Sequence, residues 1–282
     1  MKKKNLTLLF VFLSVVVIKS QSHRFYYQYQ FVPDSTKIDS IITETTRLEV
    51  FKDHSEFVSE MSAKRDSALT KSAEKQTGEI GTALPDGKFK NKIWKSKDKM
   101  YSTEYIGIEP FKVINDKKFE WKLTNEVKKI QNYLCQKATL TYGKRIWEVW
   151  FTNEIPIQDG PHIFRDLPGF IVQMKDSKNH HVFELIGNAK TQNSNSNIIE
   201  KKMFRAIEVN RKQFNKKWQD FRKNPIGGTE QFMIINPQIS QIRMYDESGN
   251  EMNMNDVRNK DREGAKKILK TSNNYLELDL YE

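Results

Sequence analysis

The hydrophobic positions of this chain follow a two-residue period over much of its length, which is typical of β-strands. This alternation predicts strands at 24–32, 46–51, 119–123, 135–142, 145–152, 170–174 and 181–187. Gly143-Lys144 separates two of them and predicts a tight hairpin. The strand after this turn has apolar residues on both faces, which favours a central position in the sheet. A further hairpin is predicted around the turn 246–250.

Three segments have the longer period of amphipathic helices. Asp53 and Glu56 predict a capped helix that runs to about Lys75, and Asn255 predicts the cap of a helix over 256–270. The third helix is predicted over 201–223, with an apolar stripe of Met203, Ile207, Phe214, Trp218 and Phe221.

Strands that pair with their sequence neighbours, with helices between groups of them, favour an α+β fold. We expect a curved antiparallel sheet with packing helices, and a half-barrel like that of bacterial lipoprotein carriers is one form of such a sheet.

The first residues have the composition of a secretory signal peptide. Three lysines precede an apolar run over 6–18, and small or polar residues follow it. We therefore expect residues 1–22 to be removed, leaving a single exported domain over 23–282. A second long apolar run is absent, so a transmembrane protein is not expected. Cys135 is the sole cysteine, and its place in an alternating run predicts a buried strand thiol.

The charge of the chain is concentrated in one element. Removal of residues 1–22, which hold four lysines, lowers the formal net charge from +11 to +7. Residues 200–223 alone contain nine Lys or Arg against three acidic residues. A helix docked on the sheet with a solvated basic face explains this pattern, and a surface that binds anionic lipid through 201–223 is the alternative. Export argues against a nucleic-acid partner.

Most catalytic signatures are absent. The sequence has no G-x-S-x-G, H-E-x-x-H, C-x-x-C, phosphate-binding or dinucleotide-binding motif, and neither a metal nor another cofactor is expected. The adjacent His180 and His181 are expected to form an exposed turn pair whose side chains diverge. The polar residues His162, Arg165 and Asp166 lie in one irregular segment. A hydrolase centred on His162 and Asp166 is therefore an alternative to a binding or structural role.

The same segment carries a family resemblance. "GPHIFRDLPGFIVQM" follows "CQKATLTYGKRIWEVWFTNEIP", and this order of motifs resembles the GLPGLI family of exported envelope proteins. The core motif is DLPGFI here, with Asp166 in place of the first Gly and Phe170 in place of the second Leu. "RKQFNKKWQDFRKNP" and "SNNYLELDL" also resemble family segments. The resemblance implies a location in the periplasm or cell envelope of a Gram-negative bacterium, no defined activity, and an outer-membrane receptor as a partner.

The two proline-glycine pairs of this segment predict sharp turns. The candidate binding or structural corner consists of Gly160, Pro161, His162, Arg165, Asp166, Leu167, Pro168 and Gly169. Pro168-Gly169 predicts a type II corner with a positive φ at Gly169, which sets the register of the next strand. We expect a non-catalytic protein that binds a protein partner, or an apolar ligand such as a lipid, in the concave face of the sheet.

Overall fold

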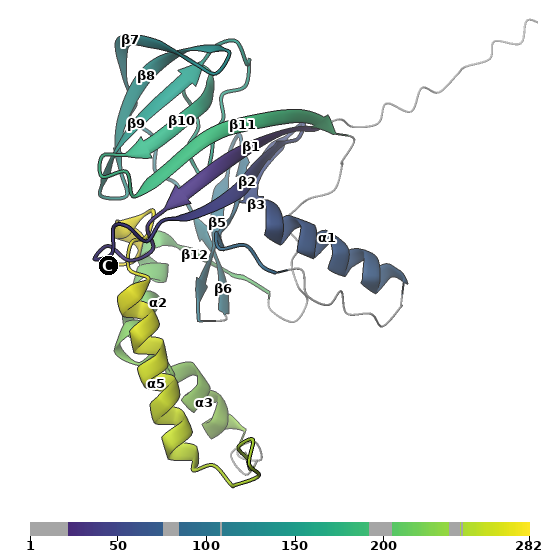
Figure 1. The fold of residues 1–282 in the computed structure, drawn as a ribbon, viewed down its shortest axis with the longest axis vertical. Coiled ribbons are helices and arrows are strands. Elements are labelled where there is room, and N and C mark those ends of the chain that lie inside the picture. The colour runs from purple at the N-terminus through teal and green to yellow at the C-terminus, as the bar shows by residue number, and fades with distance from the viewer. Residues whose placement is uncertain (1–21, 76–84, 108, 192–204, 237–242, 244) are drawn as a thin grey trace, which may run out of the picture.

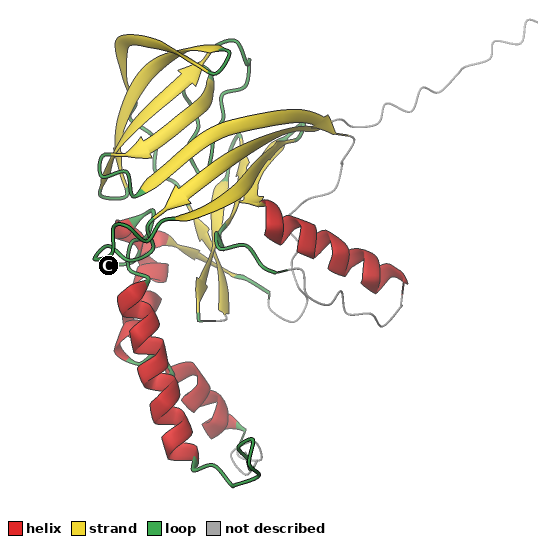
Figure 2. Ribbon diagram, viewed as in Figure 1, coloured by secondary structure: helices red, strands yellow, loops and turns green. Residues whose placement is uncertain are grey.

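A computed structural model describes residues 22–75, 85–107, 109–191, 205–236, 243 and 245–282. Its main feature is a large open sheet that curves around its own core, with helices at one end and one side (Figures 1 and 2). The strands are β1 (Ser22–Phe31), β2 (Ile42–Val50), β3 (His54–Ser59), β4 (Lys92–Ser96), β5 (Met100–Ile106), β6 (Glu109–Ile114), β7 (Lys122–Ile130), β8 (Tyr133–Tyr142), β9 (Arg145–Thr152), β10 (Phe170–Asp176), β11 (His181–Thr191) and β12 (Ile207–Asn210).

The sheet order is β12-β6-β5-β4-β3-β2-β1-β11-β10-β9-β8-β7. Strands β12 and β6 pair in parallel, and the other neighbours pair in antiparallel fashion. The predicted antiparallel sheet is therefore confirmed. The helices are α1 (Glu60–Lys75), α2 (Arg211–Lys223), α3 (Gly227–Ile235), α5 (Met254–Thr271) and the short 3₁₀ helix η1 (Leu278–Leu280).

Two predicted hairpins are confirmed. Strands β8 and β9 meet at Gly143-Lys144, and β10 and β11 follow in the expected order. Cys135 is fully buried in β8, as predicted, and burial raises the pKa of its thiol to about 11. The third hairpin is reduced to an isolated bridge between Tyr245 and Glu251, and 237–242 lie outside the described residues.

Two helix predictions are wrong at their first residues. The segment His54–Ser59 is a buried strand, so the helix predicted from Asp53 begins at Glu60. In the basic segment, Ile207–Asn210 is strand β12 and the helix begins at Arg211. Met203 lies outside the described residues. The helix predicted over 256–270 is confirmed, although Asn253 rather than Asn255 caps it.

The end of the β7-β8 hairpin folds over the outer face of its neighbours in the curled sheet. Lys128 Nζ lies 4.0 Å from the ring centroid of Trp150 on β9 and donates to Gln173 Oε1 on β10 at 3.3 Å. Gln131 in the hairpin turn donates to the main-chain oxygen of Leu185 on β11. Trp150 is thereby buried, whereas Ile146 on the same face of β9 is 58% exposed. The prediction of a strand covered on both faces holds for one part of β9 only.

The interior of the curl is filled by the chain itself. Ile163, Phe164 and Leu167, from the irregular segment between β9 and β10, are at most 1% exposed. The ring centroid of Phe164 lies 5.0 Å from that of Trp147 and 5.8 Å from that of Tyr142. We call residues 159–169 the plug. It occupies the space that a ligand in the concave face would need.

A second, smaller core joins the helical end to the sheet. It consists of Ile106, Phe111, Val113, Val209, Phe214, Trp218 and Leu280. The C-terminal residues contribute to it, since Trp218 Nε1 donates to the main-chain oxygen of Tyr281 at 2.7 Å. None of the described helices is long and apolar enough to cross a membrane.

Candidate functional site

The plug is closed by its own main chain. Asp159 and Arg165 form an antiparallel bridge, and Ile171 N donates to Asp159 O at 3.0 Å. Phe164 N donates to Pro161 O at 3.2 Å. The segment predicted as a corner is therefore a compact loop that turns into the core before strand β10 begins.

The glycines of the plug are required by close packing. A Cβ atom on Gly169 would lie 2.3 Å from Thr152 O, and one on Gly160 would lie 2.5 Å from Ile171 Cδ1. The predicted positive φ at Gly169 is wrong. Within this fully described loop, the left-handed residues are His162, with φ +54°, and Asp166, with φ +71°. The register of β10 is also adjusted by a bulge after Ile171.

A buried ion pair anchors the plug to the far part of the sheet. Lys95 Nζ on β4 donates to Asp159 Oδ1 at 2.5 Å and to Gly160 O at 2.8 Å. Ser55 Oγ donates to Asp159 Oδ2 at 2.5 Å. Because its cation is desolvated, the pKa of Lys95 is lowered, although Asp159 opposes this shift. Each group has a partner, so the arrangement is that of a structural anchor.

His162 is buried beside this pair. Its side chain packs against the rings of Phe89 and Phe164, with centroids 5.9 and 6.1 Å away. Burial, reinforced by the positive charges of Lys95 and Arg211, lowers the pKa of His162 to about 3. Its Nδ1 atom has no hydrogen-bond partner among the described residues. The imidazole is thus neutral and held by aromatic contacts.

The other polar residues of the plug point outward. Arg165 Nε donates to Asp166 Oδ1 at 3.0 Å, and the Asp166 side chain is 54% exposed. Arg165 Nη1 donates to the main-chain oxygen of Ser96 at 2.5 Å. His162 and Asp166 are therefore separated into core and surface. The contact that a carboxylate-oriented general base requires is not formed.

A second buried network holds the C-terminal segment. Arg145 Nη1 donates to Asp176 Oδ2 at 2.9 Å and Nη2 donates to Asn274 Oδ1 at 2.7 Å. His181, which is 2% exposed, shares this site: a hydrogen bond of 2.7 Å joins its Nδ1 to Tyr29 Oη. The prediction of an exposed histidine pair is therefore wrong for His181. Among the described residues, no group of His, Cys, Asp or Glu side chains is placed to hold a metal ion.

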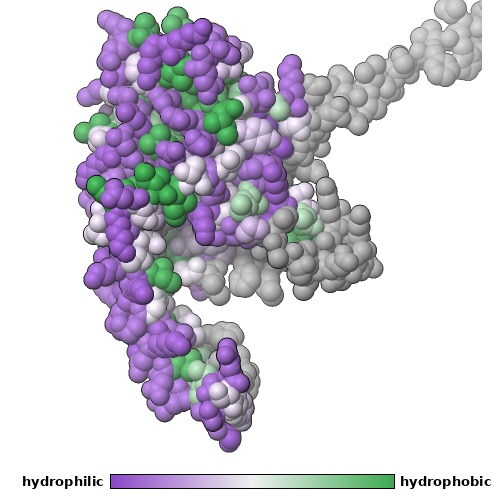
Figure 3. Space-filling view, viewed as in Figure 1, coloured by the Kyte–Doolittle hydropathy of each residue, from purple (hydrophilic) through white to green (hydrophobic). Residues whose placement is uncertain are grey.

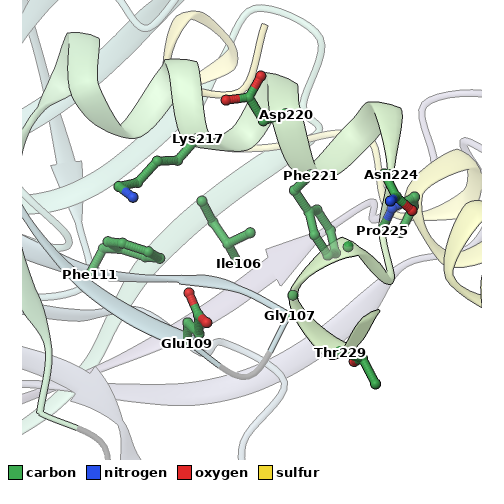
Figure 4. A pocket seen from close by; sticks show the side chains of 12 residues that line it. Ile106, Gly107, Glu109, Phe111, Lys217, Asp220, Phe221, Asn224, Pro225 and Thr229 are labelled. Atoms are coloured by element: carbon green, nitrogen blue, oxygen red, sulfur yellow. The ribbon is translucent and has the colours of Figure 1, made fainter. Parts of the chain in front are cut away.

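A pocket of about 760 Å³ lies away from the plug, between the β5-β6 turn and the helical end (Figure 4). It is lined by Ile106, Gly107, Glu109, Phe111, Lys217, Asp220, Phe221, Asn224, Pro225, Gly227, Gly228 and Thr229. Lys217 and Glu109 point into the space between the two walls, and Asp220 is turned away from it (Figure 4). Lys217 Nζ lies 5.6 Å from the ring centroid of Phe111.

Sequence reasoning did not find this pocket. Its first wall comes from the β5-β6 turn, which the hydrophobic pattern did not resolve into strands, and its second from residues about a hundred positions later. The one available signal was Pro225 and the glycine pair 227–228, which end a helix and leave its last turn uncovered.

The apolar face with which the basic helix was expected to bind lipid is used in the core. Phe214 and Trp218 are buried against β6 and the C-terminal residues. Ile207 is exposed but belongs to β12 rather than to α2. Lipid binding through an apolar stripe along 201–223 is therefore not supported by the described part of that segment.

One family model and several solved structures match parts of this chain. Residues 88–211, less than half of the chain, match the model described as "N-glycanase peptide, N-terminal domain". No curated protein matches the chain. A structure of PNGF-II in space group P21 is 18% identical with a TM-score of 0.48, over 70% of this chain and 33% of that one. A second PNGF-II structure, in space group C2, is also 18% identical, with a TM-score of 0.45, over 67% and 31%. The chain thus spans about a third of the length of these proteins.

Proposed function

We propose that this protein is a non-catalytic, carbohydrate-binding protein of the bacterial cell envelope, and that its ligand occupies the pocket between the β5-β6 turn and α2. The pocket itself is the observation that carries the proposal. Its volume of about 760 Å³ is in the range of small-ligand sites. The exported, envelope-located protein expected from the signal peptide and from the GLPGLI resemblance is part of this proposal.

The lining of the pocket suits a ligand with both an apolar face and hydroxyl groups. Ile106, Phe111 and Phe221 offer apolar surface, while Lys217 and Glu109 offer a hydrogen-bond donor and acceptors. A sugar ring presents a C–H face to an aromatic ring and its hydroxyls to polar side chains. A purely apolar ligand would instead cover Lys217 and Glu109 without replacing their contacts with water, which is costly.

The filled core favours this pocket over the concave face of the sheet. An apolar ligand was expected in the concave face of the sheet, but the plug occupies the interior of the curl formed by β7 to β11. The matched residues 88–211 support carbohydrate as the ligand class, because the family description names an N-glycanase and the match includes the β5-β6 wall. The α2 wall lies beyond the match.

The experiment is a calorimetric titration of the purified protein with an oligosaccharide released from an N-linked glycoprotein. We expect saturable binding that Phe221→Ser and Lys217→Gln each weaken at least about tenfold, since each removes a principal contact. Lys216→Gln is the matched control, because Lys216 is exposed on the same helix but does not line the pocket. It should leave the affinity unchanged.

Three results would count against the proposal. Absence of binding at millimolar oligosaccharide would exclude the carbohydrate ligand, as would binding that neither pocket variant weakens. Saturable binding of a fatty acid that Phe221→Ser weakens would favour an apolar ligand over a carbohydrate. Release of the glycan from a glycopeptide by the purified protein would contradict the non-catalytic part.

A further inference from the structure

The net positive charge of the chain after residue 22 is concentrated in the helices at one end of the molecule. Helix α2 has six basic residues and one acidic residue, α3 has one acidic residue, and α5 has six basic and three acidic residues. Their combined net charge is +7, which equals the net charge of the whole chain after residue 22. The rest of that chain, including the sheet, is therefore neutral overall.

Two of these helices form an arm that projects from the sheet. Figures 1 and 2 show α3 and α5 side by side, extending away from the strands. Arg262 Nη2 on α5 donates to Glu230 Oε1 on α3 at 2.8 Å, and Arg258 Nη2 contacts Met233 Sδ at 3.4 Å. We call residues 227–235 and 254–271 the arm. Helix α5 has no buried residue, so solvent reaches it along its length.

The arm also exposes large apolar side chains. Ile234 and Ile235, at the end of α3, are 77% and 68% exposed, and Ile268 on α5 is 65% exposed. Figure 3 shows the visible face of the arm as mostly hydrophilic with a small hydrophobic area toward its free end. Isoleucines that protrude from a basic surface are typical of elements that insert into the interface of a membrane.

Several lysines of the arm are available to an external partner. Lys260, Lys267 and Lys270 are exposed, and no ion pair involves them within the described part of the chain. Lys266, in contrast, pairs with Glu263 at 3.0 Å. The charge on α2 adds to the same end of the molecule, although its apolar residues Phe214 and Trp218 are used in the core.

We propose that the arm docks the protein on an anionic lipid bilayer. Lysines near a negatively charged membrane each contribute about 1 kcal/mol of attraction, and isoleucines anchor the arm at the boundary of the acyl chains. The occupant is a bilayer because charge and a few protruding side chains suffice for it, whereas a protein partner requires a shaped, complementary surface. The first residues of the arm, Gly227, Gly228 and Thr229, also line the proposed pocket, but its lysines and isoleucines do not, so this inference does not depend on the proposed ligand.

The test is co-sedimentation of the purified, processed protein with vesicles, after its intact mass has confirmed that residues 1–22 are absent. Vesicles of phosphatidylcholine and phosphatidylglycerol are compared with vesicles of phosphatidylcholine alone, at low and at high salt. The arm variants are the triple variant Lys260→Gln, Lys267→Gln, Lys270→Gln and the double variant Ile234→Ser, Ile235→Ser. The matched control neutralises three exposed lysines on the sheet, Lys122, Lys129 and Lys178.

We expect binding to anionic vesicles that high salt weakens, since exposed charges are screened. The triple lysine variant should bind about 100-fold more weakly at low salt, from about fivefold for each lysine. The isoleucine variant should bind at least about tenfold more weakly than the parent protein. The sheet control should bind like the parent protein.

Equal binding to neutral and anionic vesicles would overturn the proposal, as would a salt-independent interaction. An equal loss in the sheet control would show that the arm has no special role. Binding to an acidic protein without binding to vesicles would replace the lipid by a protein partner. Thermal unfolding of each variant shows whether its fold is intact, and the salt dependence of the parent protein tests the proposal without any variant.

Discussion

The buried ion pair between Lys95 and Asp159 gives the sharpest test of how the plug is held. The perturbation is Lys95→Met, which keeps the length of the side chain and removes its charge. Lys95 is 1% exposed and donates both to Asp159 Oδ1 and to Gly160 O. Its removal leaves a buried carboxylate without its cation.

The expected cost follows from what remains around Asp159. Breaking a buried ion pair at one partner typically destabilises a protein by about 3–5 kcal/mol. Here Ser55 Oγ and Gly160 N still donate to the carboxylate, at 2.5 and 2.8 Å. We therefore expect a loss near the lower limit, about 3 kcal/mol in the free energy of unfolding. Asp159→Asn should cost a similar amount, because it leaves the ammonium unpaired.

Urea unfolding of the single variants and of the double variant measures this coupling. The double variant should lose less than the sum of the two single losses, by about 2 kcal/mol, because neither charge is then left alone. Lys99→Met is the control: Lys99 and Glu208 form an exposed pair at 3.0 Å, and its loss should cost under about 1 kcal/mol. A Lys95→Met protein as stable as the Lys99→Met protein would refute the anchoring role.

Three further predictions concern the plug. The pKa of His162 is about 3 in the folded protein against 6.5 in the unfolded chain, so the unfolded chain binds the extra proton between these values. The free energy of unfolding should therefore fall as the pH falls from 6.5 to 3. His162→Asn should reduce the slope of this free energy against pH, measured by urea unfolding, by up to about 1.4 kcal/mol per pH unit. An unchanged slope would show that another group takes up the proton. The main chain at Asp166 has φ +71°, which glycine adopts without strain and alanine does not. Asp166→Gly should therefore unfold at the same or a higher temperature than the parent protein. Asp166→Ala should unfold at a lower temperature, with a loss of about 1 kcal/mol in the free energy of unfolding. Gly169→Ala should destabilise by more than either, because its Cβ would meet Thr152 O at 2.3 Å; tolerance of alanine there would contradict this packing.

The sequence predicts the strands whose alternation is clear, because alternation reports burial directly. It misses β3, β4, β5, β6 and β12, and the run predicted as a strand over 119–123 is irregular up to Lys122, where β7 begins. Strands β8 to β11 alternate clearly and were found with their turns. At 54–59, Asp53 and Glu56 have the pattern of a helix cap, which predicts a helix there. The segment is instead a short strand, and its polar Glu56 is buried. At the basic segment, Ile207 fell on the helical stripe by chance. The true start was readable: Asn210 and Gln213 form a capping box, with both hydrogen bonds present.

The candidate site was less predictable because its contacts join distant segments. Lys95 lies 64 residues before Asp159. A single sequence carries no signal that a lysine in the short run "KIWKS" enters the core beside the plug. The pocket has the same difficulty, since its two walls belong to β5-β6 and to the α2-α3 connection.

The conformation of the plug gives a physical reason for the residues at 166 and 169. Asp166, which stands where the expected GLPGLI motif has its first glycine, has φ +71°. Glycine adopts that conformation without strain, and aspartate is among the residues that tolerate it. The glycine of the pair 168–169 is needed for a different reason, the approach of Thr152 O. Both positions therefore serve the fold of a loop that fills the sheet.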